Sequence, residues 1–141
     1  MNTQASLRPA TLLHTEAFFL LAVAAVAYGH LFPHHWAFFA WLFLVPDLSL
    51  FLFVRASGGW PTTVYNVVHS YVLPLALGGV ALMGADPRFG MISLIWICHI
   101  SFDRVLGYGL KYPHHFKSTH LQSATQPFHD PAWTGTQKEG I

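Results

Sequence analysis

Apolar residues along this chain gather into four long stretches, which polar and helix-breaking residues separate. The stretches cover residues 12–31, 35–54, 61–83 and 89–110. Each is close to the roughly 20 residues that a helix needs to cross about 30 Å of hydrocarbon. Gly29 and Pro33 lie near the first boundary, and the segments SGGWP and GADPRFG form the second and third. The pattern predicts four membrane-spanning helices.

Composition supports a membrane protein. Of the 141 residues, 53% are hydrophobic and only 9% are charged, whereas soluble domains carry about a quarter charged residues. The net charge of +1, without a Lys/Arg-rich run, gives nucleic acid no basic surface. The single cysteine, Cys98, lies within an apolar stretch, excludes an internal disulfide and is interpreted as a small hydrophobe and not as a reactive thiol.

Short connections favour an all-α, antiparallel bundle of four transmembrane helices within residues 1–112, followed by a polar cytoplasmic tail at 113–141. Four spans place both termini on one side of the membrane. Most basic residues outside the spans share that side, and Arg88 is on the other. Cytoplasmic loops are enriched in Lys and Arg, so we expect a multi-pass inner-membrane protein with both termini cytoplasmic. The residues on the basic side are Arg8, Arg55, Lys111, Lys117 and Lys138.

Polar side chains from all four stretches fall at similar depths in the cytoplasmic half of the predicted bundle. Counting a rise of 1.5 Å per residue places them roughly 6 to 16 Å from the cytoplasmic end of their helices. Lipid cannot satisfy their hydrogen bonds, so they should face the bundle interior or a wet cavity. The residues of this predicted polar layer are Glu16, Asp47, Asn66, His69, His99, Asp103 and Arg104.

Acid-base catalysis on a small hydrophobic substrate is the first hypothesis for this layer. His99 and Asp103 are four residues apart and share a helix face, and a carboxylate beside an imidazole orients the ring and raises its basicity. Isomerisation, hydration or cyclisation would need no cofactor. The hypothesis assigns His99 with Asp103 as the base, His69 with Asn66 as a second donor and acceptor, Glu16 or Asp47 as the acid, and Arg104 as a charge anchor.

Three alternatives remain open at this stage. His69, His99 and Asp103 have the donor types for iron, manganese or zinc, or for a haem held by the two histidines, as in a membrane oxidoreductase. The layer could instead stabilise the helices through hydrogen bonds and ion pairs alone. An accessory subunit or a small-solute path is the third alternative. Gly78 and Gly79 would allow close helix contacts within the bundle or in a homo-oligomer.

Several motifs resemble a known family. YNVVHS at 65–70 followed by Pro74, HISFDRVLGYGLKY at 99–112 and THL at 119–121 are similar to the bacterial membrane-protein family catalogued as domain of unknown function 4260. The resemblance covers about residues 11–122. It implies a small four-span integral membrane protein and brings no activity with it.

Overall fold

The computed structural model describes residues 9–51, 59–84, 86–112 and 115–119. Within them the chain is helical apart from one short pair of strands. The helices are α1 (Pro9–Leu31), α2 (Trp36–Phe43), the 3-10 helix η1 (Pro46–Leu50), α4 (Trp60–Val68), α5 (Val72–Leu82) and α6 (Pro87–Val105). Strand β1 (Lys111–Tyr112) pairs antiparallel with β2 (His115–Thr119). The helical class predicted from the sequence is confirmed.

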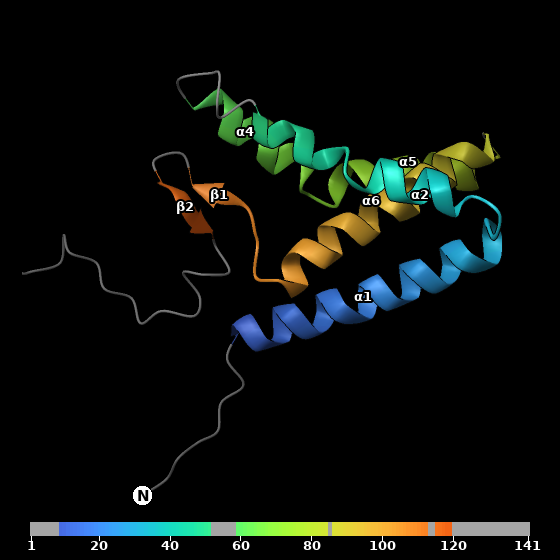
Figure 1. The fold of residues 1–141 in the computed structure, drawn as a ribbon, viewed down its shortest axis with the longest axis horizontal. Coiled ribbons are helices and arrows are strands. Elements are labelled where there is room, and N and C mark those ends of the chain that lie inside the picture. Colours follow the sequence, from blue (N-terminus) through green and yellow to red (C-terminus); the bar gives the residue numbers. More distant parts are fainter. Residues whose placement is uncertain (1–8, 52–58, 85, 113–114, 120–141) are drawn as a thin grey trace, which may run out of the picture.

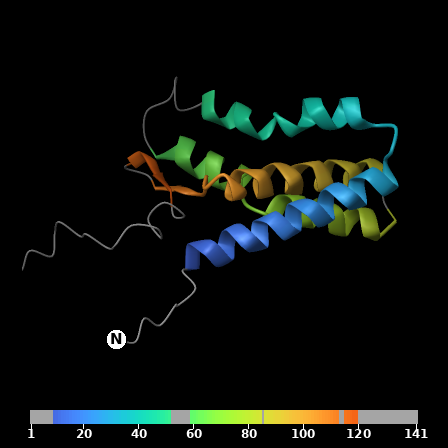
Figure 2. The same cartoon turned by 60° about the horizontal axis from the view of Figure 1, so that its bottom comes forward.

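The helices run back and forth in four passes: α1, then α2 with η1, then α4 with α5, and last α6 (Figures 1 and 2). By length and composition, α1 is the one described helix that could cross a membrane alone. The pair α4 and α5, bent by 41°, could form a second span. The four membrane spans therefore stay a prediction. Most of the predicted tail lies outside the described residues.

Proline explains why two of the predicted helices are each divided. The stretch 35–54 breaks after Leu44, and Pro46 begins η1, where its missing N–H costs nothing. The stretch 61–83 breaks between Val68 and Val72, because the ring of Pro74 clashes with the carbonyl four residues earlier in a continuous helix. Both breaks interrupt the backbone within an apolar stretch.

Helix α6 forms the centre of the molecule, packing against α1 on one side and α5 on another (Figure 2). The buried residues of α1 are mostly small, and Ala10, Ala17 and Ala24 let its backbone approach α6 closely. Helix α6 ends at Val105, five residues before the predicted end, and Gly107 follows with a φ of +89°. Cys98 is free and buried.

Large apolar side chains cover much of the outer surface. Trp41 is 80% exposed and Leu82 is 91% exposed, and many other aromatic and aliphatic residues on every pass are more than a third exposed. A water-soluble monomer rarely presents so much contiguous apolar surface.

Candidate metal centre

Four ionisable side chains from three of the passes meet beside the C-terminal half of α6. Asp47 comes from η1, His69 from the break between α4 and α5, and His99 and Asp103 from α6. On α6 the spacing of four residues places the last two on one face, as predicted. One ligand atom from each residue lies within 4.8 Å of the other three. We call these four residues the cluster.

The distances within the cluster are nearly equal. The two histidine Nε2 atoms are 3.3 Å apart. Asp103 Oδ2 lies 3.6 Å from each of them, and Asp47 Oδ1 lies 3.7 Å from each. The carboxylate separations are too long for hydrogen bonds. The two Nε2 atoms are therefore within hydrogen-bonding distance of each other, and the two carboxylates lie just beyond that distance from both of them.

Both histidines are buried and held in place. His69 is 4% exposed and His99 is 1% exposed. His69 Nδ1 lies 3.0 Å from the carbonyl oxygen of Tyr65, and because a carbonyl only accepts, Nδ1 carries the hydrogen and donates it. The Nε2 lone pair of His69 is then directed at the cluster. The ring of His69 also stacks on Tyr65 at 3.9 Å, and His99 packs against the edge of Phe43 at 5.2 Å.

Two carboxylates in this space bring like charges together. Asp103 is 18% exposed, whereas Asp47 is 44% exposed at the outer side of the cluster. The Lys111 amine lies 4.4 Å from the centre of the Tyr65 ring. Burial lowers the pKa of Lys111, while the charges of Asp103 and Asp47 act in the opposite direction. The cluster thus has an acidic outer edge that a nearby ammonium group partly offsets.

The other three residues of the predicted layer lie outside the cluster. The Asn66 side chain donates to the Lys111 carbonyl at 2.9 Å and accepts from the Lys111 N–H at 2.8 Å, which fixes β1 against α4. The Arg104 guanidinium lies 4.2 Å from the centre of the Tyr71 ring. Glu16 is exposed on α1, the pass that contributes nothing to the cluster.

A haem between the two histidines does not fit this arrangement. Axial nitrogens on opposite sides of a haem iron would be about 4 Å apart, with a porphyrin plane between them. Here the Nε2 atoms are 3.3 Å apart, and the two carboxylates occupy the neighbouring space. The four donor atoms could instead hold a metal ion.

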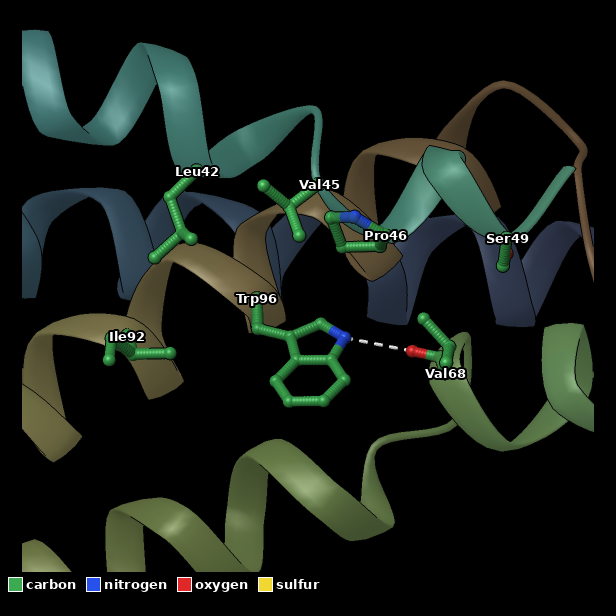
Figure 3. A pocket seen from close by; sticks show the side chains of 7 residues that line it. All are labelled: Leu42, Val45, Pro46, Ser49, Val68, Ile92 and Trp96. Atoms are coloured by element: carbon green, nitrogen blue, oxygen red, sulfur yellow. Dashed lines mark hydrogen bonds between the residues drawn. The ribbon is translucent and has the colours of Figure 1, made fainter. Parts of the chain in front are cut away.

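A cavity of about 280 Å³ lies between α2, η1, α4 and α6 (Figure 3). Its lining is almost entirely apolar, with Leu42 and Val45 on one side and Ile92 and Trp96 of α6 on the other. Trp96 Nε1 donates to the Val68 carbonyl at 2.8 Å, which fixes the indole as a wall (Figure 3). This cavity could not be predicted from the sequence, because its apolar lining residues look the same in sequence as lipid-facing ones.

Comparison with known proteins gives one family. A family model described as a domain of unknown function (DUF4260) matches residues 10–124, which is most of the chain. No curated protein and no solved structure matches the chain. The match confirms the family resemblance of the sequence motifs, and the family description states no activity.

Proposed function

The chain belongs to the family described as domain of unknown function 4260, and we propose that it is an integral membrane protein that binds one divalent transition-metal ion in the cluster. Asp47, His69, His99 and Asp103 would be the ligands. The description of the family assigns no activity, so the proposal depends on the geometry and chemistry of these four side chains.

The spacing of the donor atoms carries the proposal. An ion with ligands at 2.0 to 2.2 Å in a tetrahedron has ligand-to-ligand distances of about 3.3 to 3.6 Å. Five of the six distances in the cluster are between 3.3 and 3.7 Å, and the sixth, between the two carboxylates, is no longer than 4.8 Å. The nearly even spacing of the two imidazole nitrogens and the two carboxylate oxygens suits ligands of a shared cation.

Charge balance favours a divalent ion. Two carboxylates and two neutral imidazoles sum to −2, and a +2 ion brings the cluster to zero, which suits a buried site. The donor types suit zinc, iron(II) or manganese(II). Such an ion supplies Lewis acidity toward an oxygen of a bound molecule. The better buried His69, His99 and Asp103 would hold the ion, and the more exposed Asp47 is the ligand that water or substrate would replace.

A membrane location is supported by composition and by the exposed apolar surface. Only 9% of residues are charged, and α1 has the length and hydropathy of a span. Backbone breaks such as that between α4 and α5 are tolerated at membrane depth where they are buried in protein or line a cavity. We propose a multi-pass protein of the inner membrane with both termini cytoplasmic, from the distribution of Lys and Arg.

Metal analysis of the purified protein tests the proposal. The protein should be expressed without a His-tag, extracted in detergent and analysed by mass spectrometry for metals. We expect about one equivalent of zinc, iron or manganese, and its loss in His99→Gln and Asp103→Asn. Glu16→Gln is the matched control, because it removes an exposed carboxylate of the predicted layer outside the cluster. Wild-type protein that stays metal-free after incubation with each ion would refute the metal site.

Acid-base catalysis without a metal is the second candidate, and the contact between the histidines favours it. The Nε2 atoms at 3.3 Å can share one hydrogen, with His99 donating to the lone pair of His69. Such a pair can accept and return a proton to a bound molecule. Nitrogen NMR of labelled imidazoles in metal-depleted protein should then show one protonated and one bare Nε2. Two Nε2 atoms of the same state would contradict it.

A further inference from the structure

The apolar cavity and the cluster lie along the same face of α6. Ile92 and Trp96 line the cavity, and His99 and Asp103 belong to the cluster. Their spacings of four, three and four residues keep all four side chains within a narrow sector of the helix. His99 is about 5 Å along the axis from Trp96 and about 10 Å from Ile92. The cavity therefore continues from the cluster toward the N-terminal end of α6.

On each of the other two passes, the residue that precedes a cluster residue lines the cavity. Val68 lines the cavity and the next residue, His69, belongs to the cluster. Pro46 lines the cavity and the next residue, Asp47, belongs to the cluster. Each of the three passes thus places neighbouring side chains in the two sites. A molecule bound in the cavity would have one end beside the cluster.

Ser49 supplies a polar group to the otherwise apolar lining. It follows Pro46 by three residues in η1, and positions three apart lie above one another in a 3-10 helix, so both face the cavity (Figure 3). Ser49 is 8% exposed, and its Oγ is buried without a hydrogen-bond partner among the residues that the structure describes. A buried hydroxyl of this kind normally has a partner. A ligand oxygen would provide one.

We propose that this cavity binds a lipophilic molecule with a hydrocarbon body and a single hydroxyl or carbonyl group, which bonds to Ser49 beside the cluster. The cavity volume of about 280 Å³ is the volume that roughly nine water molecules occupy in the liquid, and it offers space for about ten heavy atoms. The apolar lining favours a ligand with a hydrocarbon body, and the Ser49 hydroxyl favours a ligand with an oxygen atom to which it can hydrogen-bond. That this molecule is the substrate of the metal centre rests on the proposed function.

The occupant is inferred to be a small molecule from the membrane and not a polar metabolite. Trp96 Nε1 is already bonded to Val68, so among the lining side chains that the structure describes only Ser49 offers a free polar group. A polar ligand would lose its hydration without replacement. An ordinary acyl chain would fill the cavity but would leave Ser49 unbonded.

Fluorine NMR in lipid nanodiscs tests the inference on the full chain. The probe is a straight-chain alkanol of about six carbons, the last of them a trifluoromethyl group, which has about ten heavy atoms; it is compared with the fluorinated alkane of the same length. We expect a bound resonance, distinct from that of the probe dissolved in lipid, for wild-type protein. Val45→Phe fills the cavity and should abolish the resonance. Val72→Phe, which adds the same bulk on an exposed position of α5, should retain it.

Ser49→Ala tests the hydrogen bond without adding bulk. The alanine variant should bind the alkanol about 2- to 10-fold more weakly and the alkane unchanged. If wild-type protein binds the alkanol and the alkane equally well, the inference that the ligand carries a hydroxyl or carbonyl group is overturned. That result would indicate an acyl chain as the occupant. A resonance unaffected by Val45→Phe, or no bound resonance, would overturn the cavity as the binding site.

Replacing Zn²⁺ by paramagnetic Co²⁺ connects the probe to the cluster. We expect the bound resonance to shift or broaden with Co²⁺ in wild-type protein and not in His99→Gln. Metal content is measured on the same samples. If the protein takes up Co²⁺ and the resonance of the bound probe does not change, the cavity is not next to the cluster. Only that part of the inference is then overturned. Protein that takes up no metal while it binds the alkanol would overturn the proposed function, and with it the assignment of the probe site to a metal centre.

Discussion

The stability of the Asp103→Asn variant distinguishes a cluster that binds a metal ion from a cluster that only stabilises helix packing. Without an ion, the facing oxygens of Asp47 and Asp103 are at most 4.8 Å apart, which corresponds to a repulsion of about 3.5 kcal/mol at an effective dielectric constant of about 20. Because Asp47 is 44% exposed, screening by solvent reduces this to about 1 to 3 kcal/mol. Asp103 is 3.6 Å from each imidazole, so little hydrogen bonding is lost. Asp103→Asn should therefore stabilise the metal-free protein.

Metal reverses the sign of this effect. An ion at a free concentration of 100 times its dissociation constant stabilises the folded protein by about 2.7 kcal/mol. The asparagine variant lacks the charge that completes the site and should gain much less. Asp103→Asn is then more stable than wild type in chelator and less stable in excess metal. If the cluster only stabilises the bundle, the substitution lowers stability under both conditions.

Thermal unfolding in detergent, with EDTA and with Zn²⁺, measures both effects. For a chain of this size, 1 kcal/mol corresponds to about 3 to 5 °C in Tm. Glu16→Gln should behave as wild type in both conditions. The reasoning is refuted if wild-type Tm is insensitive to Zn²⁺, Fe²⁺ and Mn²⁺ and Asp103→Asn lowers Tm in chelator.

Three further predictions concern packing, the β1 attachment and pH. Gly78→Ala should lower Tm relative to Gly79→Ala by the equivalent of about 1 to 3 kcal/mol, because a Cβ on Gly78 would lie 2.8 Å from Ser93 Oγ and one on Gly79 would meet nothing within 4 Å. Asn66→Ala removes both bonds to the Lys111 backbone, so hydrogen exchange at the Lys111 amide should accelerate, by about tenfold for a cost near 1.4 kcal/mol. Metal occupancy, followed by dialysis and metal analysis, should fall as pH is lowered, because protons compete for the imidazole nitrogens; constant occupancy down to pH 4 would contradict histidine ligation.

The sequence predicted the cluster better than it predicted the path of the backbone. Charged and imidazole groups are costly in an apolar stretch, so Asp47, His69, His99 and Asp103 were identifiable from their chemistry and approximate depth. The depth of a residue does not determine the direction of its side chain. Glu16 adjoins Ala17, which faces α6, and is therefore turned outward.

The helix breaks in the second and third passes could not be predicted from hydropathy. Continuous apolar composition predicts continuous helices over 35–54 and 61–83, whereas the structure interrupts both. Pro46 and Pro74 were the available signals, but a proline inside an apolar stretch is compatible with a kink as well as with a break. Where a helix stops depends on what the interrupted backbone can bond to, which is a property of the tertiary structure.

Those two breaks are also the strongest reason to regard the cluster as more than a device for holding helices together. Contacts between helices are also present elsewhere: Ser93 donates to the Pro74 carbonyl at 2.7 Å, and Tyr71 and Ser101 share a hydrogen bond of 2.9 Å. Interrupting a helix sacrifices backbone hydrogen bonds, and at membrane depth each unsatisfied group is expensive. Both interruptions occur beside the same segment of α6, and each directs one ionisable side chain into the cluster and the preceding residue into the cavity. Both features suit the proposed ion beside a bound lipophilic molecule.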